Sequence, residues 1–472
     1  MSRSSLPEPH PNGHPRWVLI LASLSSFMVA LDAMVVTTAL GTMRDSLHAS
    51  MQALQWTVNA YNLSFAVFLM TGAALGDRFG RRRMLLAGLA LFTASSAACA
   101  LASDVAWLIA ARALQGMGAA LVMPLAMALL TAAFAKEARG KALGLFSSIT
   151  GLALIIGPAV GGVVAQGLAW QWIFWINLPV GLAVMPLVRS RIPESRGPNA
   201  ALDLPGLACA TLAALGLVWA LTRGHAAGWS SLEVEMSLAA GVLFAVGFMG
   251  WERAAPAPMV PLRLFRSRAF SSGIAAAFLF YAPMTGTLFF LPQFLQAQGH
   301  GPLDAGLRIV PWTATLFVTA PIAGRLVNRL GERMLVTTGV LLQAVGFAWI
   351  AAIAAPDLAY ARLAPALVVA GAGVSMAMPA VQNAVLGAVA PLEIGKASGT
   401  FNMVRYLGNV FGVALLVEVF SHGGDLGSAQ AFSGGFAHAM WVAAALSLLS
   451  AAVGLRLPGR GAAMPAAAAA KA

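Results

Sequence analysis

The sequence predicts an all-α membrane protein with fourteen transmembrane helices, arranged as two six-helix bundles with two further helices between them. Three observations support this fold class. The 472 residues are 59% hydrophobic and only 10% charged, whereas a soluble domain carries about 25% charged residues. Apolar runs of about twenty residues, each long enough to cross a bilayer, recur from Trp17 to Leu455. Lys and Arg concentrate in alternate loops, as the positive-inside rule requires.

The expected spans follow one another along the chain with polar loops between them. Residues 1–16 are polar and Pro-rich, which predicts a disordered cytoplasmic tail. The next apolar run is too long for a signal-peptide core and contains Asp32, so we interpret it as an uncleaved first span. The expected spans cover residues 17–40, 53–74, 84–102, 105–130, 142–165, 171–188, 206–222, 234–251, 270–293, 306–327, 334–354, 362–386, 398–420 and 434–456. The alanine-rich tail at 457–472 is expected to be cytoplasmic and to carry no chemistry.

Two longer polar segments divide these spans into groups. Residues 189–205 and the loop at 252–269 separate spans seven and eight from the others as a central pair. We therefore expect an N-terminal six-helix bundle at 17–188 and a C-terminal six-helix bundle at 270–456. The linker between them, residues 189–269, contains the two additional transmembrane helices.

The distribution of basic residues supports this layout. With the N-terminus inside, 23 of the 29 Lys and Arg residues fall in or beside inside segments, and two, Arg112 and Arg405, fall within spans. Four lie outside: Arg44, Arg223, Arg308 and Arg362. Both termini are therefore predicted to be cytoplasmic. The formal charge of +12 reflects topology, and we expect no nucleic-acid partner.

Two inside loops have similar sequences. The loop after span two contains Asp77-Arg78-Phe79-Gly80-Arg81-Arg82, and the loop after span ten contains Asn328-Arg329-Leu330-Gly331-Glu332-Arg333. Each joins the second and third helices of its bundle, as expected for two halves related by an axis along the membrane normal. An acid here can meet a helix N-terminus or an arginine and hold the halves together in one state. We predict this gating role for Asp77, Arg78, Gly80 and Arg81; alternatively, the arginines only set the topology.

Spans four and five carry the features that suggest transport. Arg112 lies within an apolar run, where a guanidinium that cannot be deprotonated is costly and normally faces a protein-lined cavity with an anionic partner. Gly157, Gly161 and Gly162 leave one helix face nearly bare for a close neighbour, and Pro158 favours a kink. A charged cavity beside a bent, tightly packed helix is typical of a transporter.

These segments resemble motifs of the major facilitator superfamily, specifically of its fourteen-helix drug:proton antiporter branch. Residues 77–82 are similar to the cytoplasmic loop motif of the superfamily. Residues 112–118 resemble the fourth-helix motif associated with proton coupling, and residues 157–162 resemble the fifth-helix antiporter motif. Residues 31–40 resemble the acid motif of the first helix, and residues 172–181 also fit the branch. Four positions depart from the family pattern: Thr37, Gly41, Ala73 and Ala153.

Asp32 and Arg112 are expected at the same depth. Each lies about eight residues, or roughly 12 Å, from the outer end of its span, so a charge pair is possible if the helices adjoin. Burial favours the protonated acid, whereas a nearby arginine favours the carboxylate. We predict that this competition couples proton movement, with Asp32 protonated when facing outside and releasing its proton inside. The alternative is a static ion pair that locks the bundle.

Two other charged residues in span thirteen have open interpretations. Glu418, near the outer end, is a candidate second proton or cation site, or else an interfacial acid that contacts water. Arg405, about seven residues from the inner end, either lines the inner vestibule or snorkels toward the membrane surface.

A cargo surface is predicted from polar and adaptable apolar side chains. Tyr61, Asn62 and Asn59 lie near the depth of Asp32 and either contact cargo or proton or cross-bond helices. Methionine and aromatic side chains repack readily around varied cargo, although such stripes more often face lipid or core. The predicted substrate-binding residues are Tyr61, Asn62, Gln115, Met123, Phe280, Tyr281 and Arg405, with Met127, Phe278 and Met284 in the same apolar set.

The resemblance implies a proton-driven antiporter that exports amphipathic, cationic or neutral small molecules across a bacterial-type plasma membrane. Protons are then the coupling ion, and no cofactor is expected. A dedicated exporter of one metabolite or lipid and a non-transporting membrane sensor or scaffold are the alternatives. The sequence shows no nucleophile–base pair, metal-ligand spacing or nucleotide signature, so neither an enzyme nor a metal site is expected. We expect a monomer; the sequence leaves open whether a periplasmic adaptor protein is engaged.

Overall fold

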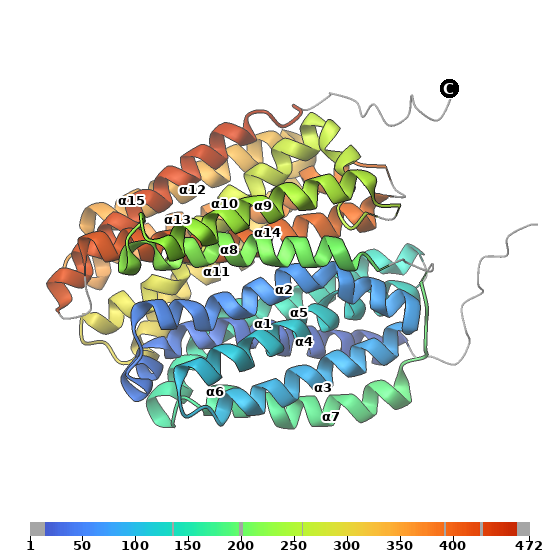
Figure 1. Cartoon of the computed structure of the whole chain (residues 1–472), viewed down its shortest axis with the longest axis horizontal. Helices are drawn as coiled ribbons and strands as arrows, with labels where there is room; N and C mark the ends of the chain where they lie inside the picture. Colours follow the sequence, from blue (N-terminus) through green and yellow to red (C-terminus); the bar gives the residue numbers. More distant parts are fainter. Residues whose placement is uncertain are drawn as a thin grey trace, which may run out of the picture.

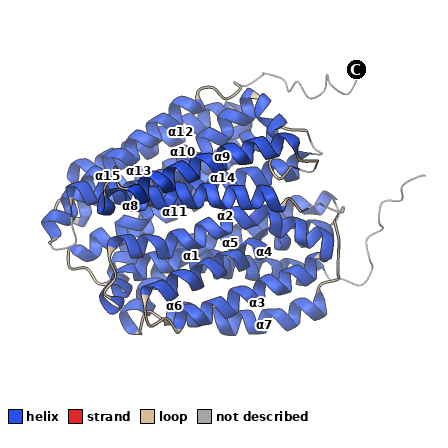
Figure 2. Ribbon diagram, viewed as in Figure 1, coloured by secondary structure: helices blue, strands red, loops and turns tan. Residues whose placement is uncertain are grey.

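The computed structural model describes residues 15–134, 136–197, 202–256, 258–390, 393–424 and 428–459. Every regular element within these ranges is a helix (Figure 2). Fourteen of these helical segments are long and apolar enough to cross a bilayer, as the sequence predicted.

The helices follow the expected order. The first half contains α1 (Pro15–Leu47), α2 (Met51–Phe79), α3 (Arg81–Ala100), α4 (Val105–Ala133), α5 (Lys136–Gly167), α6 (Trp172–Trp175) and α7 (Asn177–Arg191). The central pair is α8 (Leu204–Ala227) and α9 (Leu232–Ala254). The second half contains η1 (Leu262–Arg266), α10 (Arg268–Ala297), α11 (Pro302–Leu330), α12 (Glu332–Ile353), α13 (Tyr360–Gly387), α14 (Ile394–Gly423) and α15 (Ala429–Gly454).

Most helices are longer than the spans expected from hydropathy. The apolar run marks only the part of a helix that lies in lipid, whereas main-chain hydrogen bonding continues until a capping residue ends it. Ser50 accepts the N–H of Ala53 at the start of α2, and Asp104 accepts the N–H of Trp107 at the start of α4. These caps fix the starts of the two helices.

The sixth span is confirmed as one membrane-crossing segment, Trp172–Arg191, and it is divided into α6 and α7 at Ile176. Pro179 has no N–H to donate to the carbonyl of Trp175, so the helix cannot continue regularly through this point. The break places Asn177 in the first turn of α7.

The elements form two bundles that lie side by side, with α1–α7 in one half and α10–α15 in the other (Figure 1). The bundles meet where α2 packs against α14 and where α5 packs against α11. In each pair, the second helix of one bundle meets the fifth helix of the other. This reciprocal pairing is the one that an axis between two equivalent halves produces.

The central pair lies against the seam between the bundles. Leu63 of α2, Val218 of α8 and Val410 of α14 belong to one buried apolar cluster. The Gln55 side chain of α2 also donates to Thr222 of α8 over 2.9 Å. The two added helices therefore cover the α2–α14 contact and leave the α5–α11 contact to the bundles themselves.

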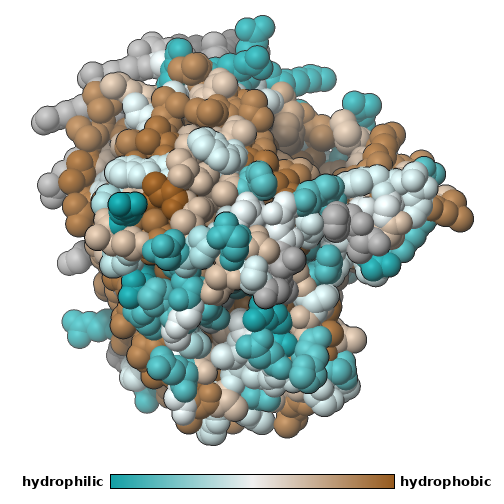
Figure 3. Space-filling view, turned by 90° about the vertical axis from the view of Figure 1, so that its left-hand side faces the viewer, coloured by the Kyte–Doolittle hydropathy of each residue, from teal (hydrophilic) through white to brown (hydrophobic). Residues whose placement is uncertain are grey.

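We call the end that carries the loop between α1 and α2 the α1–α2 end, and the opposite end the α2–α3 end. Figure 3 looks onto the α1–α2 end, where hydrophilic side chains gather over the middle and apolar side chains border them. The sequence predicts that this end faces the outside of the cell.

Candidate functional site

An ion pair buried in the first bundle forms the centre of the candidate site. Asp32 of α1 and Arg112 of α4 are each 2% exposed. One guanidinium nitrogen, Nη1 of Arg112, lies 2.5 Å from Oδ2 of Asp32. The two helices do adjoin, and the residues that the sequence placed at one depth are in direct contact.

Two amide side chains complete the surroundings of the acid. Gln115 donates to Oδ1 of Asp32 over 2.8 Å, and Asn177 donates to the same oxygen over 2.9 Å. Gln115 also accepts from Nη1 of Arg112 over 2.7 Å. Asn177 is anchored in turn by Ser96 of α3, whose hydroxyl lies 3.0 Å from the amide nitrogen. Residues of α4 and α7 therefore hold the Asp32 side chain of α1, with both of its carboxyl oxygens in use.

Three members of this network, Gln115, Asn177 and Ser96, add to what the sequence predicted. Gln115 was predicted to bind substrate, but the structure places it between Asp32 and Arg112. Asn177 and Ser96 were not predicted as site residues at all. Each lies about six residues from the outer end of its expected span, roughly 9 Å. The same depth count that paired Asp32 with Arg112 is a signal that could have found them.

The arginine is covered by aromatic rings. The guanidinium carbon of Arg112 lies 4.2 Å from the centre of the Tyr61 ring and 5.8 Å from that of Phe174. The Nε of Arg112 donates to the carbonyl of Thr57 over 3.3 Å. Gly116 allows this approach, because a Cβ there would collide with the Tyr61 carbonyl of α2. Tyr61, predicted as a substrate residue, thus packs directly on the ion pair.

The glycine-rich helix α5 packs against two neighbours at once. A Cβ on Gly157 or Gly161 would collide with Met34 or Val35 of α1, which follow Asp32 closely. A Cβ on Gly162 would lie 2.6 Å from the Cα of Leu303 in α11. Pro158, predicted to bend this helix, lies inside α5 and presents its carbonyl to Gly306 of α11. Helix α5 therefore connects the Asp32 helix to the second bundle.

The Asp77 loop is bonded within the first bundle. Asp77 accepts from Nε of Arg81 over 2.8 Å, and Glu194, after α7, accepts the N–H of Arg82 over 2.9 Å. Gly80 has φ 109°, a conformation that favours glycine, and Arg78 lies over the ring of Phe79. In this conformation the predicted latch between the two halves is not formed among the described residues. Sequence reasoning also missed Glu194, which ties α3 to α7.

Glu418 belongs to a different environment from Asp32. It is 7% exposed, and its Oε1 accepts from the indole nitrogen of Trp229 over 3.2 Å. His422 lies one turn further along α14, 3.8 Å from the same oxygen. Glu418 therefore contacts the loop between α8 and α9, and both interpretations of its role, a second proton site or an interfacial acid, stay predictions.

The remaining predicted cargo residues are distributed between core and surface. Phe280 is fully buried and Met123 packs against the core of the first bundle. Met127 is 40% exposed, whereas Asn59 is fully buried. Arg405 lies over the rings of Tyr281 and Tyr406, with its carbon 4.9 and 5.3 Å from their centres. Asn62 is 8% exposed, and Phe278 and Met284 are half-buried. Their roles in cargo binding stay predictions.

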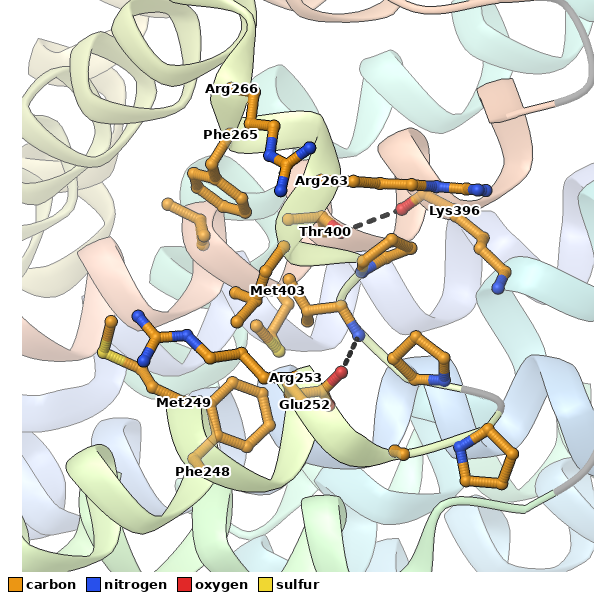
Figure 4. A pocket seen from close by; sticks show the side chains of 17 residues that line it. Phe248, Met249, Glu252, Arg253, Arg263, Phe265, Arg266, Lys396, Thr400 and Met403 are labelled. Carbon is orange, nitrogen blue, oxygen red and sulfur yellow. Dashed lines mark hydrogen bonds between the residues drawn. The ribbon is translucent and has the colours of Figure 1, made fainter.

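A separate pocket of about 970 Å³ opens at the α2–α3 end, between α9, η1 and α14 (Figure 4). Four cations line it: Arg253, Arg263, Arg266 and Lys396. Arg263 pairs with Glu393 over 2.7 Å. None of the residues predicted for coupling or cargo lines this pocket, so it is distinct from the Asp32 site.

Comparison with known proteins agrees with this architecture. The sequence model of the Major Facilitator Superfamily matches residues 22–413. The chain is 34% identical to the multidrug resistance protein Stp of Mycobacterium tuberculosis, over 85% of this chain and 75% of that protein. It is 34% identical to the tetracenomycin C resistance and export protein of Streptomyces glaucescens, over 88% of this chain and 78% of that protein. It is 35% identical to the cephamycin export protein CmcT of Amycolatopsis lactamdurans, over 86% and 85% of the two chains.

Solved structures share the fold at low identity. The xylose transporter XylE from E. coli, in a partially occluded inward open conformation, superposes with a TM-score of 0.65 at 16% identity, covering 95% of this chain and 99% of that one. A POT family transporter with a thioalcohol conjugated peptide gives 0.71 at 15% identity, covering 94% and 97%. The chain therefore belongs to the major facilitator superfamily, as shown by the family model that matches most of the chain and by the relatives above 30% identity.

Proposed function

We propose that the protein is a proton-coupled antiporter that exports amphipathic small molecules across the plasma membrane by alternating access. The buried Asp32–Arg112 pair is the observation that carries this proposal, because it ties the charge of one acid to the packing of several helices. Support also comes from the relatives, whose names describe multidrug resistance and the export of tetracenomycin C and cephamycin.

Protonation of Asp32 would change its contact with Arg112. Gln115 and Asn177 could still donate to Oδ1. A proton on Oδ2 would, however, remove the charge from the oxygen that now faces Nη1 of Arg112. Arg112 would be left buried without a counter-charge, an arrangement that is strongly unfavourable. Rearrangement of α1 relative to α4 relieves this cost.

Such a movement of α1 has a direct route to the second bundle. Gly157 and Gly161 hold α5 against α1, and Gly162 holds α5 against α11. Gly162 and Leu303 lie near the α1–α2 end, which we take as the outer end, so this seam closes the protein toward the outside. The ionised, paired Asp32 then belongs to the state that has released its proton inward, in keeping with the predicted cycle.

Replacing Asp32 tests the proposal. Asp32→Asn keeps the size of the side chain but removes the titrating acid. In inside-out vesicles under an imposed pH gradient, we expect uptake of fluorescent amphiphiles to fall to the level of vesicles lacking the protein. Asp45→Asn is the matched control, since Asp45 is exposed and pairs with its neighbour Arg44. Undiminished pH-driven uptake by Asp32→Asn, at normal protein abundance, defeats the assignment.

A dedicated exporter of one compound is the second candidate. The names of some relatives, such as the cephamycin export protein and the probable actinorhodin transporter, point to single cargoes. A susceptibility panel with and without expression separates the two candidates, because a dedicated exporter protects against one chemical class only.

We further propose a bacterial plasma membrane as the location, with both termini cytoplasmic and the monomer as the functional unit. The Lys and Arg asymmetry supports the orientation. A cysteine introduced at Ser4 tests it, because a membrane-impermeant thiol reagent should label that residue in inside-out vesicles and leave it unlabelled in intact cells.

A further inference from the structure

The second bundle contains a cationic side chain, Arg405, that has no anionic partner among the described residues. Arg405 lies about eleven residues into α14, roughly 16 Å from its start, which is deep in a membrane-spanning helix. Its Nε is buried and makes no hydrogen bond to any described residue. Within the described ranges, no carboxylate lies within ion-pair distance of its guanidinium. Arg112 differs in this respect, because it donates to the Asp32 carboxyl group, the Gln115 amide oxygen and the Thr57 carbonyl.

Aromatic rings, rather than acids, surround Arg405. The ring centres of Tyr281 and Tyr406 lie 4.9 and 5.3 Å from the guanidinium carbon. The Tyr281 hydroxyl is buried as well and has no hydrogen-bond partner among the described residues. Two buried polar atoms that have no hydrogen-bond partner among the described residues, Nε of Arg405 and the hydroxyl oxygen of Tyr281, therefore belong to side chains that pack on each other, although the Arg405 side chain as a whole is half-buried.

The same rings reach the first bundle. Tyr406 packs on Phe65 of α2 with 4.0 Å between ring centres, and Phe65 lies 6.3 Å from Tyr61. Tyr61 in turn covers Arg112. A continuous series of rings thus runs between the two arginines and crosses the contact between the bundles. A ligand bound at Arg405 would therefore lie next to the contact between the two bundles.

We propose that Arg405 is a cargo-binding residue that receives the acidic group of an aromatic, anionic small molecule. A guanidinium at this depth normally has an anionic partner, and it recognises carboxylates and sulfonates with two parallel donors. Since no described residue supplies such a partner, we assign this role to the cargo, while the tyrosine and phenylalanine rings contact its aromatic part. This inference rests on the proposed export function and replaces the cationic or neutral cargo expected from the sequence.

Equilibrium binding to the purified protein tests this proposal without requiring transport. The probes are naphthalene-2-sulfonate, naphthalene-2-sulfonamide and trimethyl(2-naphthyl)ammonium, which share one ring system and differ in charge. We expect the sulfonate to bind at least about tenfold more tightly than the cation, a difference of about 1.4 kcal/mol. Arg405→Gln should abolish that preference and Arg405→Lys should retain part of it. Arg223→Gln should behave as the wild type, since Arg223 is exposed and pairs with Glu233.

Several outcomes would overturn the proposal. Unchanged sulfonate binding by Arg405→Gln would do so, as would equal affinity of the wild type for the cation. Equal competition by methanesulfonate would show a site for any small anion, without a role for the rings. Thermal unfolding of each variant verifies that it is folded. If Arg405→Gln does not fold, the binding of the three probes to Arg405→Lys serves as the test, and an unchanged preference for the sulfonate in that variant would overturn the proposal. Charge-selective binding without gradient-driven flux in proteoliposomes would count against the proposed function but leave this site standing.

Discussion

At the scale of single residues, the structure distinguishes two arginines that look alike in the sequence. Both lie in apolar runs; Arg112 was expected to face a cavity with an anionic partner, and Arg405 either to line the inner vestibule or to snorkel toward the membrane surface. Arg112 is paired with Asp32, whereas Arg405 lies over the rings of Tyr281 and Tyr406 and has no ion-pair partner among the described residues. This difference underlies the two proposals, in which Arg112 takes part in proton coupling and Arg405 binds an anion.

Asn177 provides a prediction at this scale. Its amide makes a hydrogen bond to the charged Asp32, and such bonds contribute about 1.5–3 kcal/mol to stability. We expect Asn177→Ala to lower the free energy of unfolding by that amount and to impair proton-driven uptake. Thermal unfolding in detergent and the vesicle assay measure the two effects.

Asn402→Ala is the matched control for this substitution. The Asn402 amide donates only to a main-chain carbonyl one turn away in its own helix, that of Ser398. Its loss should therefore cost less, about 0.5–1.5 kcal/mol. Equal destabilisation by the two substitutions would contradict a special role for Asn177 beside the acid.

At the scale of elements, α5 is the helix that joins the ion pair to the opposite bundle. Its bare face touches α1 on one side and α11 on the other. The glycine spacing predicted close packing, but which helices would fill the space was not predictable. Helix α7 is a second case, because the break at Ile176 places Asn177 beside Asp32 and the sequence predicted neither the break nor this contact.

Gly162 provides a prediction about this element. A valine there would collide with the main chain of Leu303, and overpacking of this kind costs about 1–3 kcal/mol. We expect Gly162→Val to disfavour the conformation in which α5 and α11 touch. Cross-linking between cysteines introduced at Gln166 and Leu303, which lie in contact, reports on that conformation. The native Cys99 and Cys209 are replaced by serine for this measurement.

Gly167→Val serves as the control on the same helix, because a Cβ at Gly167 meets nothing within 4 Å. It should leave the cross-linking yield unchanged. A high yield in Gly162→Val as well would mean that the glycine face does not control the α5–α11 contact.

At the scale of the whole molecule, the charge of the cargo determines how the membrane potential acts. Outward movement of a monoanion and inward movement of one proton each carry one positive charge inward. Together they gain roughly 4.6 kcal/mol per 100 mV, since each charge contributes about 2.3 kcal/mol. A monovalent cation exchanged for one proton would gain nothing from the potential.

This difference predicts that transport of naphthalene-2-sulfonate is electrogenic. In proteoliposomes without a pH gradient, a potassium diffusion potential set with valinomycin should drive net movement of the sulfonate toward the side of the membrane at positive potential. Collapse of the potential should stop it. Transport that ignores the potential would show an electroneutral exchange and contradict the one-proton, one-anion cycle.

The sequence by itself determined the number of spans, their order, the two-bundle plan and the shared depth of Asp32 and Arg112. These follow from local quantities, namely run length, charge distribution and residue count along a helix of known rise. It did not determine the break in the sixth span, the amides around Asp32, the bonding of the Asp77 loop within its own bundle, or the isolation of Arg405. Those depend on the rotation of each helix about its axis and on its neighbour at that depth, which only the packing of all the helices together sets.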